Sequence, residues 1–186
     1  LRMSRGLGDV YKRQPEEWEK PENKSKLAQK DIDADWTKKN GERHFGYKDH
    51  VKCDADSKLI TNYSVTSASV HDSQRCLVFI GQEDEVLYAD SAYSGKPIAL
   101  ALPENCKNQI CEKGYRNSPL TSEQKMNNRR KSRIRCRIEQ IFGFMTGAMH
   151  GITIRSIGIT RAWMNIGITN LVYNFCRYSY LKRASA

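Results

Sequence analysis

The sequence predicts a mixed α/β domain, in which a sheet of antiparallel and parallel strands is flanked by helices. Three observations support this prediction. Apolar and polar residues alternate over residues 45–65, as they do in a half-buried hairpin. A short apolar run over 86–89 is bounded by polar residues, as expected of a buried strand. Apolar residues then recur at helical spacing over 134–149.

Composition and charge narrow the functional classes. The 186 residues are enough for one domain with a hydrophobic core. Thirty-one Lys and Arg against 21 Asp and Glu give a net charge of +10, which favours a polyanionic partner, most commonly nucleic acid. A merely basic, soluble surface is the alternative. No apolar run approaches the roughly 18 residues of a membrane span, so we expect no membrane partner. The six cysteines form no CxxC pair, and we expect reduced thiols in a cytoplasmic protein.

The N-terminal part of the chain does not have the pattern of a folded domain. Residues 1–14 lack apolar periodicity, and their end, DVYKRQ, can be back-translated into the end of a transposon-derived sequencing adaptor. We therefore expect 1–14 to be a disordered, adaptor-derived artefact, with a natural disordered arm as the alternative. Residues 15–43 are charged and contain two prolines, which predicts a solvent-exposed connector.

The middle of the chain predicts strands and short helices. Around a polar DADS turn, the alternating residues, among them Tyr47 and Val65, predict a β-hairpin. Residues 70–84 predict a short helix with Asp72 or Ser73 near its N-cap. A strand over 85–90, a helix over 95–105 and a further strand around 109–111 follow.

Two long helices are predicted in the C-terminal part. Thr121 and Gln124 have the spacing of a capping box, so a helix should begin there and continue to about residue 151. Its apolar stripe consists of Ile134, Ile138, Ile141, Met145 and Met149. The last helix should cover 160–183, and the domain should end at about residue 180, with 181–186 as a tail. Its candidate packing residues are Trp163, Ile166, Leu171, Tyr173 and Cys176.

Two carboxylates are candidates for chemistry. Asp90 ends a predicted buried strand, where ligands and metals collect in open α/β sheets, although a turn-forming role explains it equally well. Glu139 lies at the margin of the apolar stripe, and the alternative is a surface ion pair with Arg135 one turn earlier. Beside a basic helix, such a pair would suit a divalent-metal site that acts on phosphodiesters. Residues 107–137 supply that basic surface, with ten Lys or Arg against two Glu.

Three blocks of the sequence resemble one enzyme family. They are HFGYKDHVKCDADSKLITNYSVTSASVHDS, VLYADSAYSG and RIRCRIEQIFGF, in that order. Together they resemble bacterial insertion-sequence transposases of the DDE type, in the ribonuclease H-like superfamily and nearest to insertion-sequence group five. The resemblance extends from Pro15 to about Tyr180.

The resemblance implies a ribonuclease H-like mixed sheet, an activity and a site. Members of this family cut transposon ends and join the freed 3′-hydroxyl to target DNA, using Mg²⁺ or Mn²⁺ held by Asp, Asp and Glu. Asp90 matches the second aspartate, Glu139 matches the glutamate, and both would be catalytic metal ligands. The DNA partner would be double-stranded and would contact Arg135, Arg129, Arg130, Lys131, Arg133 and Lys48. Ser132 and Thr146 depart from the family's signature, so DNA contacts made at those positions in other members are not expected here.

The first aspartate of the family lies on a strand before the hairpin. We therefore expect the first strand and its aspartate upstream of this chain, which leaves residues 44–180 as the C-terminal part of a catalytic domain that is inactive alone. Asp31, Asp33 and Asp35 lie in the charged segment and are not expected to substitute. The resemblance also implies a cytoplasmic, nucleoid-associated protein, with a homo-oligomer as a further candidate assembly. A metal-dependent nuclease of the same fold and a non-catalytic, basic DNA-binding module are the alternative functions.

Overall fold

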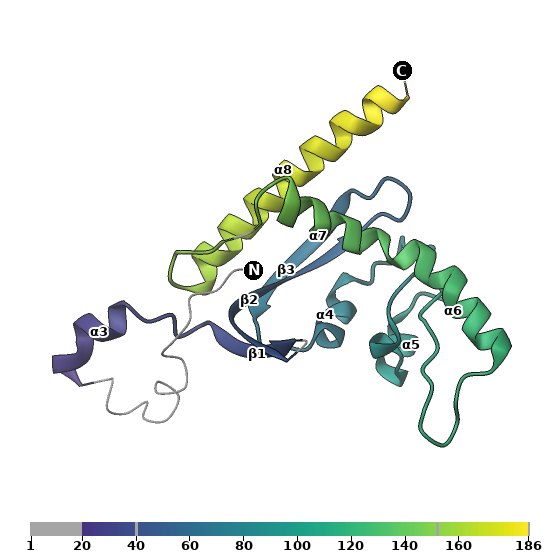
Figure 1. Ribbon diagram of the computed structural model, residues 1–186, viewed down its shortest axis with the longest axis horizontal. Helices are drawn as coiled ribbons and strands as arrows, with labels where there is room; N and C mark the ends of the chain where they lie inside the picture. The colour runs from purple at the N-terminus through teal and green to yellow at the C-terminus, as the bar shows by residue number, and fades with distance from the viewer. Residues whose placement is uncertain (1–19, 40, 152, 186) are drawn as a thin grey trace.

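The computed structural model describes residues 20–39, 41–151 and 153–185 (Figure 1). The expected artefact at 1–14 therefore lies outside the described residues. In chain order the elements are η1 (Pro21–Asn23), α3 (Lys24–Ala28), β1 (Asp35–Lys39), β2 (Glu42–Cys53), β3 (Ile60–Ser67), α4 (Asp72–Phe79), β4 (Val86–Leu87), η2 (Ser91–Tyr93), α5 (Lys96–Ala101), β5 (Lys107–Asn108), α6 (Ser122–Arg135), α7 (Arg137–Gly147) and α8 (Ile159–Ala184).

The β2–β3 hairpin confirms the strongest sequence pattern. The two strands pair antiparallel, with Tyr47 opposite Ser67 and a register shift between Lys52 and Cys53. Asp54 closes the DADS turn, because its Oδ2 accepts hydrogen bonds from the backbone N–H and the hydroxyl of Ser57, at 2.7 and 2.6 Å. These bonds stabilise the ionised carboxylate and lower the pKa of Asp54.

Strand β1 lies inside the segment expected to be an exposed connector, and here the structure differs from the expectation. Residues 35–39 pair antiparallel with the start of β2. Trp36 packs on Phe45 across the pair, with ring centroids 5.3 Å apart, and Ala34 just before the strand is buried. Cross-strand aromatic contacts of this kind stabilise a pair whose other residues are polar. The charged residues Lys38 and Lys39 are exposed on an edge strand, where charge is common.

The strands form two separate sheets in the described part of the chain. One has the order β1-β2-β3, and the other is the parallel pair β4-β5. The parallel hydrogen-bond pattern continues past the assigned strands to the Cys111 N–H, which donates to the Ala89 carbonyl at 3.0 Å. The strand expected at 85–90 is thus confirmed in a shorter form. The assigned strand next to the one expected at 109–111 is β5, which covers 107–108 and ends before residue 109. Val86 is 38% exposed, so β4 is not fully buried.

Helices α6 and α7 occupy the region expected to be one long helix. The capping box is confirmed, because the Gln124 N–H donates to Thr121 Oγ1 at 3.2 Å and the Thr121 N–H donates to Gln124 Oε1 at 2.9 Å. The helix ends at Arg135, however, and α7 begins after Cys136. The part of the apolar stripe that lies on α7 packs in the core, with Ile141 and Met145 both at 0% exposure, whereas α6 has no buried residue.

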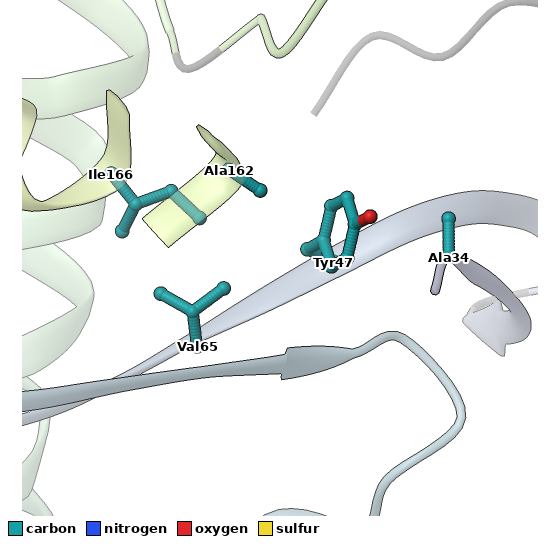
Figure 2. Close-up of a cluster of buried hydrophobic side chains, with 5 residues drawn as sticks. All are labelled: Ala34, Tyr47, Val65, Ala162 and Ile166. Atoms are coloured by element: carbon teal, nitrogen blue, oxygen red, sulfur yellow. The ribbon is translucent and has the colours of Figure 1, made fainter. Parts of the chain in front are cut away.

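Helix α8 crosses the three-stranded sheet and completes the core (Figure 1). Its buried residues are Ala162, Ile166, Asn170 and Tyr173. Figure 2 shows two of them, Ala162 and Ile166, above Val65 and Tyr47 of the hairpin. Of the expected packing residues, Ile166 and Tyr173 are confirmed. Trp163 is 51% exposed, but its ring packs against Tyr63 of β3, with centroids 5.7 Å apart. The prediction was wrong for Leu171 and Cys176, which are exposed.

The fold is mixed α/β, with small sheets flanked by helices, and it is consistent with the expected ribonuclease H-like architecture. All six cysteines are free thiols. None of the helices among the described residues is both long enough and apolar enough to cross a membrane.

Candidate functional site

Asp90 lies three residues after the end of β4 and directly after Ala89, the last residue in the parallel hydrogen-bond pattern, where the chain turns into η2. Its backbone is extended, and its Oδ1 accepts a hydrogen bond from the Ser91 N–H at 2.6 Å. The side chain is exposed to solvent. Asp90 therefore has the turn-forming contact that the alternative interpretation expects, and it also presents a carboxylate at the carboxyl end of a strand.

The negative charges of Asp90 and of a second acidic residue, Asp72, both act on Tyr93. Burial raises the pKa of Tyr93 to about 12, and the nearby negative charges of Asp72 and Asp90 add to the effect. The charges of two carboxylates thus act on one phenol group that follows β4.

Asp72 connects helix α4 to strand β2, a role that sequence reasoning missed. It is the first residue of α4, and its Oδ1 lies 3.4 Å from Lys48 Nζ and 3.5 Å from His50 Nδ1. The other ring nitrogen of His50 lies 2.8 Å from Thr66 Oγ1 on β3. Burial lowers the pKa of His50. The only sequence signal for this role was the pair His71-Asp72 at the start of the predicted helix. A capping role was enough to explain that pair.

Glu139 lies in the first turn of α7. Its Oε1 is 3.0 Å from Arg135 Nη1, and its side chain is 62% exposed. The ion pair that was the alternative interpretation is therefore present. The neighbouring residues of Glu139 hold α7 against the hairpin turn: the Arg137 guanidinium donates to the Ala55 carbonyl, and Gln140 Oε1 accepts from Lys58 at 2.6 Å.

The structure does not join Asp90 and Glu139 into one ligand cluster. Asp90 contacts the η2 turn, whereas Glu139 contacts the end of α6. Within residues 20–39, 41–151 and 153–185, no group of three or more His, Cys, Asp or Glu side chains could hold a metal ion.

The three aspartates of the N-terminal segment have structural contacts. Asp31 Oδ1 accepts from the Tyr47 hydroxyl at 2.5 Å, and Asp35 Oδ1 accepts from the Trp36 N–H at 2.7 Å. Asp33 Oδ2 accepts from the Ile159 N–H at 2.9 Å, which satisfies an amide in the first turn of α8. Structural hydrogen bonds account for all three carboxylates.

Helix α6 presents an open groove with a cationic side. Its lining residues are Leu120, Lys125, Asn128, Arg129, Ser132, Arg133 and Cys136. Lys125, Arg129 and Arg133 are four residues apart, and all three are exposed. Because residues at this spacing lie on one face of a helix, these side chains form a cationic stripe. Arg130, beside this stripe, is also exposed.

The other three candidate DNA contacts are engaged within the chain. Lys48 donates to the Val70 carbonyl at 2.8 Å, and Lys131 donates to the Ile110 carbonyl at 3.0 Å. Arg135 pairs with Glu139. The candidate residues thus divide into exposed cations on α6 and cations that hold elements together.

Comparisons with known proteins agree with the resemblance described above. A family model described as "Transposase DDE domain" matches residues 17–175. The transposase for insertion sequence element IS1106 of Neisseria meningitidis serogroup B is 34% identical over 117 residues, which cover 61% of this chain and 40% of that relative. The chain therefore spans about two fifths of the length of this relative. No solved structure matches the chain. The family model covers most of the sequence, and the chain belongs to the transposase DDE domain family.

Proposed function

We propose that this chain is the C-terminal part of the catalytic domain of an insertion-sequence transposase, residues 44–180, and that the whole enzyme cuts and joins DNA in the bacterial cytoplasm at the nucleoid. The family match over 17–175 is the single observation that carries the proposal. The carboxylate at the end of β4, the carboxylate at the start of α7 and the cationic stripe on α6 support it.

Asp90 and Glu139 fit a hard divalent cation in the chemistry of their donors. Both are exposed carboxylates, and Mg²⁺ and Mn²⁺ prefer oxygen ligands. Held by Asp90 and Glu139, such an ion would supply positive charge to the attacking and leaving oxygens of phosphoryl transfer. Glu139 would exchange its contact with Arg135 for the metal, while Asp90 can keep the Ser91 hydrogen bond through one oxygen.

Two carboxylates do not complete a site that needs about three ligands. The resemblance places the first aspartate on a strand before the hairpin. The two sheets described here, β1-β2-β3 and β4-β5, are not joined by a shared strand. We therefore propose that this chain holds two of the three ligands and does not catalyse the reaction by itself.

Metal binding tests the assignment of the two carboxylates. We expect Asp90→Asn and Glu139→Gln each to weaken Mn²⁺ binding by about tenfold or more, because the loss of outer-shell partners alone costs 10–100-fold in metal affinity. The free Mn²⁺ remaining after titration can be measured by electron paramagnetic resonance. Both substitutions keep the side-chain shape, and asparagine keeps the acceptor for Ser91.

Glu123→Gln is the matched control. Glu123 is an exposed glutamate in the first turn of α6, as Glu139 is in the first turn of α7, and it lies outside the proposed site. Equal Mn²⁺ affinity in all four proteins would contradict the metal site and would favour the DNA-binding module without chemistry.

DNA binding tests the cationic stripe. Arg129→Ala combined with Arg133→Ala should lower the slope of log K against log salt by roughly 2 for double-stranded DNA, because each lost phosphate contact removes about 0.9. Fluorescence anisotropy at several salt concentrations measures this slope. The control, Lys182→Ala combined with Arg183→Ala, removes the same charge from the exposed end of α8 and should retain the slope. An equal decrease of the slope in the two double variants would indicate that DNA binding depends on net charge alone.

The nuclease alternative differs in the joining step. A transposase that includes the upstream strand joins a pre-cleaved 3′ end to target DNA, whereas a nuclease of the same fold only cuts. Strand-transfer products from a labelled, pre-cleaved end separate these two functions.

A further inference from the structure

The segment between β5 and α6 contains an exposed loop with a closed tip, residues 112–120, which we call the 112–120 finger. Two backbone hydrogen bonds close the tip: the Tyr115 N–H donates to the Ser118 carbonyl at 3.0 Å, and the Ser118 N–H donates to the Tyr115 carbonyl at 3.1 Å. Gly114 lets the two limbs approach each other, because a Cβ atom there would lie 3.2 Å from Leu120 Cγ. In Figure 1 the chain between α5 and α6 extends away from the sheets.

The base of the 112–120 finger is fixed to α6. Asn128 of α6 contacts the backbone of Glu112 twice: its Oδ1 accepts from the Glu112 N–H at 2.8 Å, and its Nδ2 donates to the Glu112 carbonyl at 2.9 Å. Lys131 Nζ donates to the Ile110 carbonyl at 3.0 Å. The other end of the finger leads into the capping box at Thr121. A loop held in this way loses little conformational freedom when its tip binds a ligand.

The tip of the finger presents an aromatic ring beside cations. Tyr115 is 64% exposed, and Lys113 Nζ lies 5.9 Å from the centroid of its ring. Lys113 and Arg116 are both exposed, whereas the acidic residue of the finger, Glu112, lies 3.8 Å from Lys131. A single exposed tyrosine is ordinary on a protein surface. An exposed ring on a fixed turn, with a cation before it and another after it, is typical of surfaces that bind the bases and phosphates of a single strand.

We propose that the 112–120 finger binds single-stranded DNA, with the ring of Tyr115 stacked on a base and with Lys113 and Arg116 near the backbone phosphates. This inference rests on the proposed DNA function and adds a form of DNA that the cationic stripe on α6 does not distinguish. Within a duplex the faces of each base are covered by its neighbours. A protein ring therefore stacks on a base at no further cost where that base is already unpaired.

The finger and the cationic stripe are neighbouring surfaces. Leu120, the last residue of the finger, and Asn128, which holds its base, both line the groove that contains Lys125, Arg129 and Arg133. The stripe attracts phosphates in either form of DNA, because its contacts are electrostatic. Stacking at the tip depends on an accessible base face and so favours the single strand.

Fluorescence anisotropy of the full chain with a labelled oligothymidylate and with a labelled blunt duplex tests the proposal. Tyr115→Ala should weaken binding of the single strand by about tenfold or more, because one base–aromatic stack is lost, and should change duplex binding by less than about twofold. Tyr115→Phe keeps the ring and should bind the single strand within about twofold of the wild type. Unchanged duplex binding also shows that each variant is folded.

Tyr178→Ala is the matched control, because it removes a tyrosine of α8 that is 58% exposed, and it should leave both affinities unchanged. Unchanged single-strand affinity in Tyr115→Ala would overturn the finger proposal, while a loss of duplex binding in the Arg129 and Arg133 double variant would still support the proposed function. Equal weakening of strand and duplex binding in Tyr115→Ala, or a loss in Tyr115→Phe as large as in Tyr115→Ala, would also overturn the finger proposal. A wild type that binds neither DNA would contradict the proposed function as well.

Discussion

Replacing Asp49 with asparagine should raise the free energy of unfolding by about 4 kcal/mol near pH 8 and leave it nearly unchanged near pH 4. Asp49 lies on β2, opposite Val65 of β3. Burial raises its pKa to about 7, and the hydrogen bond from Asn170 of α8 only partly offsets this shift. An ionised carboxylate at this position is removed from water, and no nearby cation compensates its charge.

The contacts of Asp49 explain why asparagine should fit better. Asp49 Oδ1 accepts from Asn170 Nδ2 at 3.3 Å. In the described structure, Asp49 Oδ2 and Asn170 Oδ1 are both buried without a hydrogen-bond partner. Both atoms are hydrogen-bond acceptors, so they cannot form a hydrogen bond with each other. A protonated carboxyl group or an amide supplies the missing donor at the position of Oδ2, so both orphaned atoms can be satisfied.

The sign of the pH dependence follows from the direction of the shift. Below about pH 4, Asp49 is protonated in both the folded and the unfolded chain, and its contribution to the free energy of unfolding is fully present. As the pH rises from about 4 to 7, the unfolded chain releases the proton and the folded chain keeps it, so stability falls. Above about pH 7 the carboxyl group is ionised in both states, and the loss of stability no longer changes with pH. The opposite pH dependences expected from Asp54 and His50, whose pKa values are lowered, are common to both proteins and cancel in the difference.

Urea unfolding of the wild type and of Asp49→Asn at several pH values measures this difference. Asp56→Asn makes the same chemical change at a side chain that is 98% exposed, and it should show no gain that increases with pH. A difference between wild type and Asp49→Asn that is constant from about pH 4 to 8 would mean that Asp49 ionises freely in the folded chain.

Asp49 also shows where sequence reasoning succeeded and where it could not. The hairpin, the capping box at Thr121 and the stripe through Met145 were predictable, because alternation, cap spacing and helical periodicity are local patterns. The same alternation contains Asp49 among the residues that face α8. No local pattern indicates that this carboxyl is buried against Asn170, a residue 121 positions later.

The differences have the same physical origin in contacts distant along the chain. Strand β1 has one aromatic anchor, Trp36, whose partner Phe45 lies in the next strand, so its charged sequence resembled a connector. Lys48 was expected to face DNA, but its partners are on α4 and in the loop before it. For the candidate site, the positions of Asp90 and Glu139 on their elements were predictable, while the proximity of Asp72 to Asp90 depends on the packing of α4.

Met145→Ala should lower the free energy of unfolding by about 2–5 kcal/mol, because a fully buried methionine leaves a cavity when it is truncated. Met145 has no exposed surface and packs with Ile60, Ile141 and Tyr173, from the hairpin, α7 and α8. Three elements thus meet at one side chain. A loss of this size is a large share of the roughly 5–15 kcal/mol that stabilises a domain, so the urea midpoint should fall clearly.

Met126→Ala provides the comparison, since it is the same substitution in a helix at a side chain that is 50% exposed. This substitution should change the free energy of unfolding by no more than about 0.5 kcal/mol. Helix propensity changes equally in both variants, so their difference reports the packing of α7 alone. Equal costs would show that α7 is not docked on the hairpin in solution. Glu139 would then have no fixed position relative to Asp90, and the proposed metal site would lose its second ligand together with the fold.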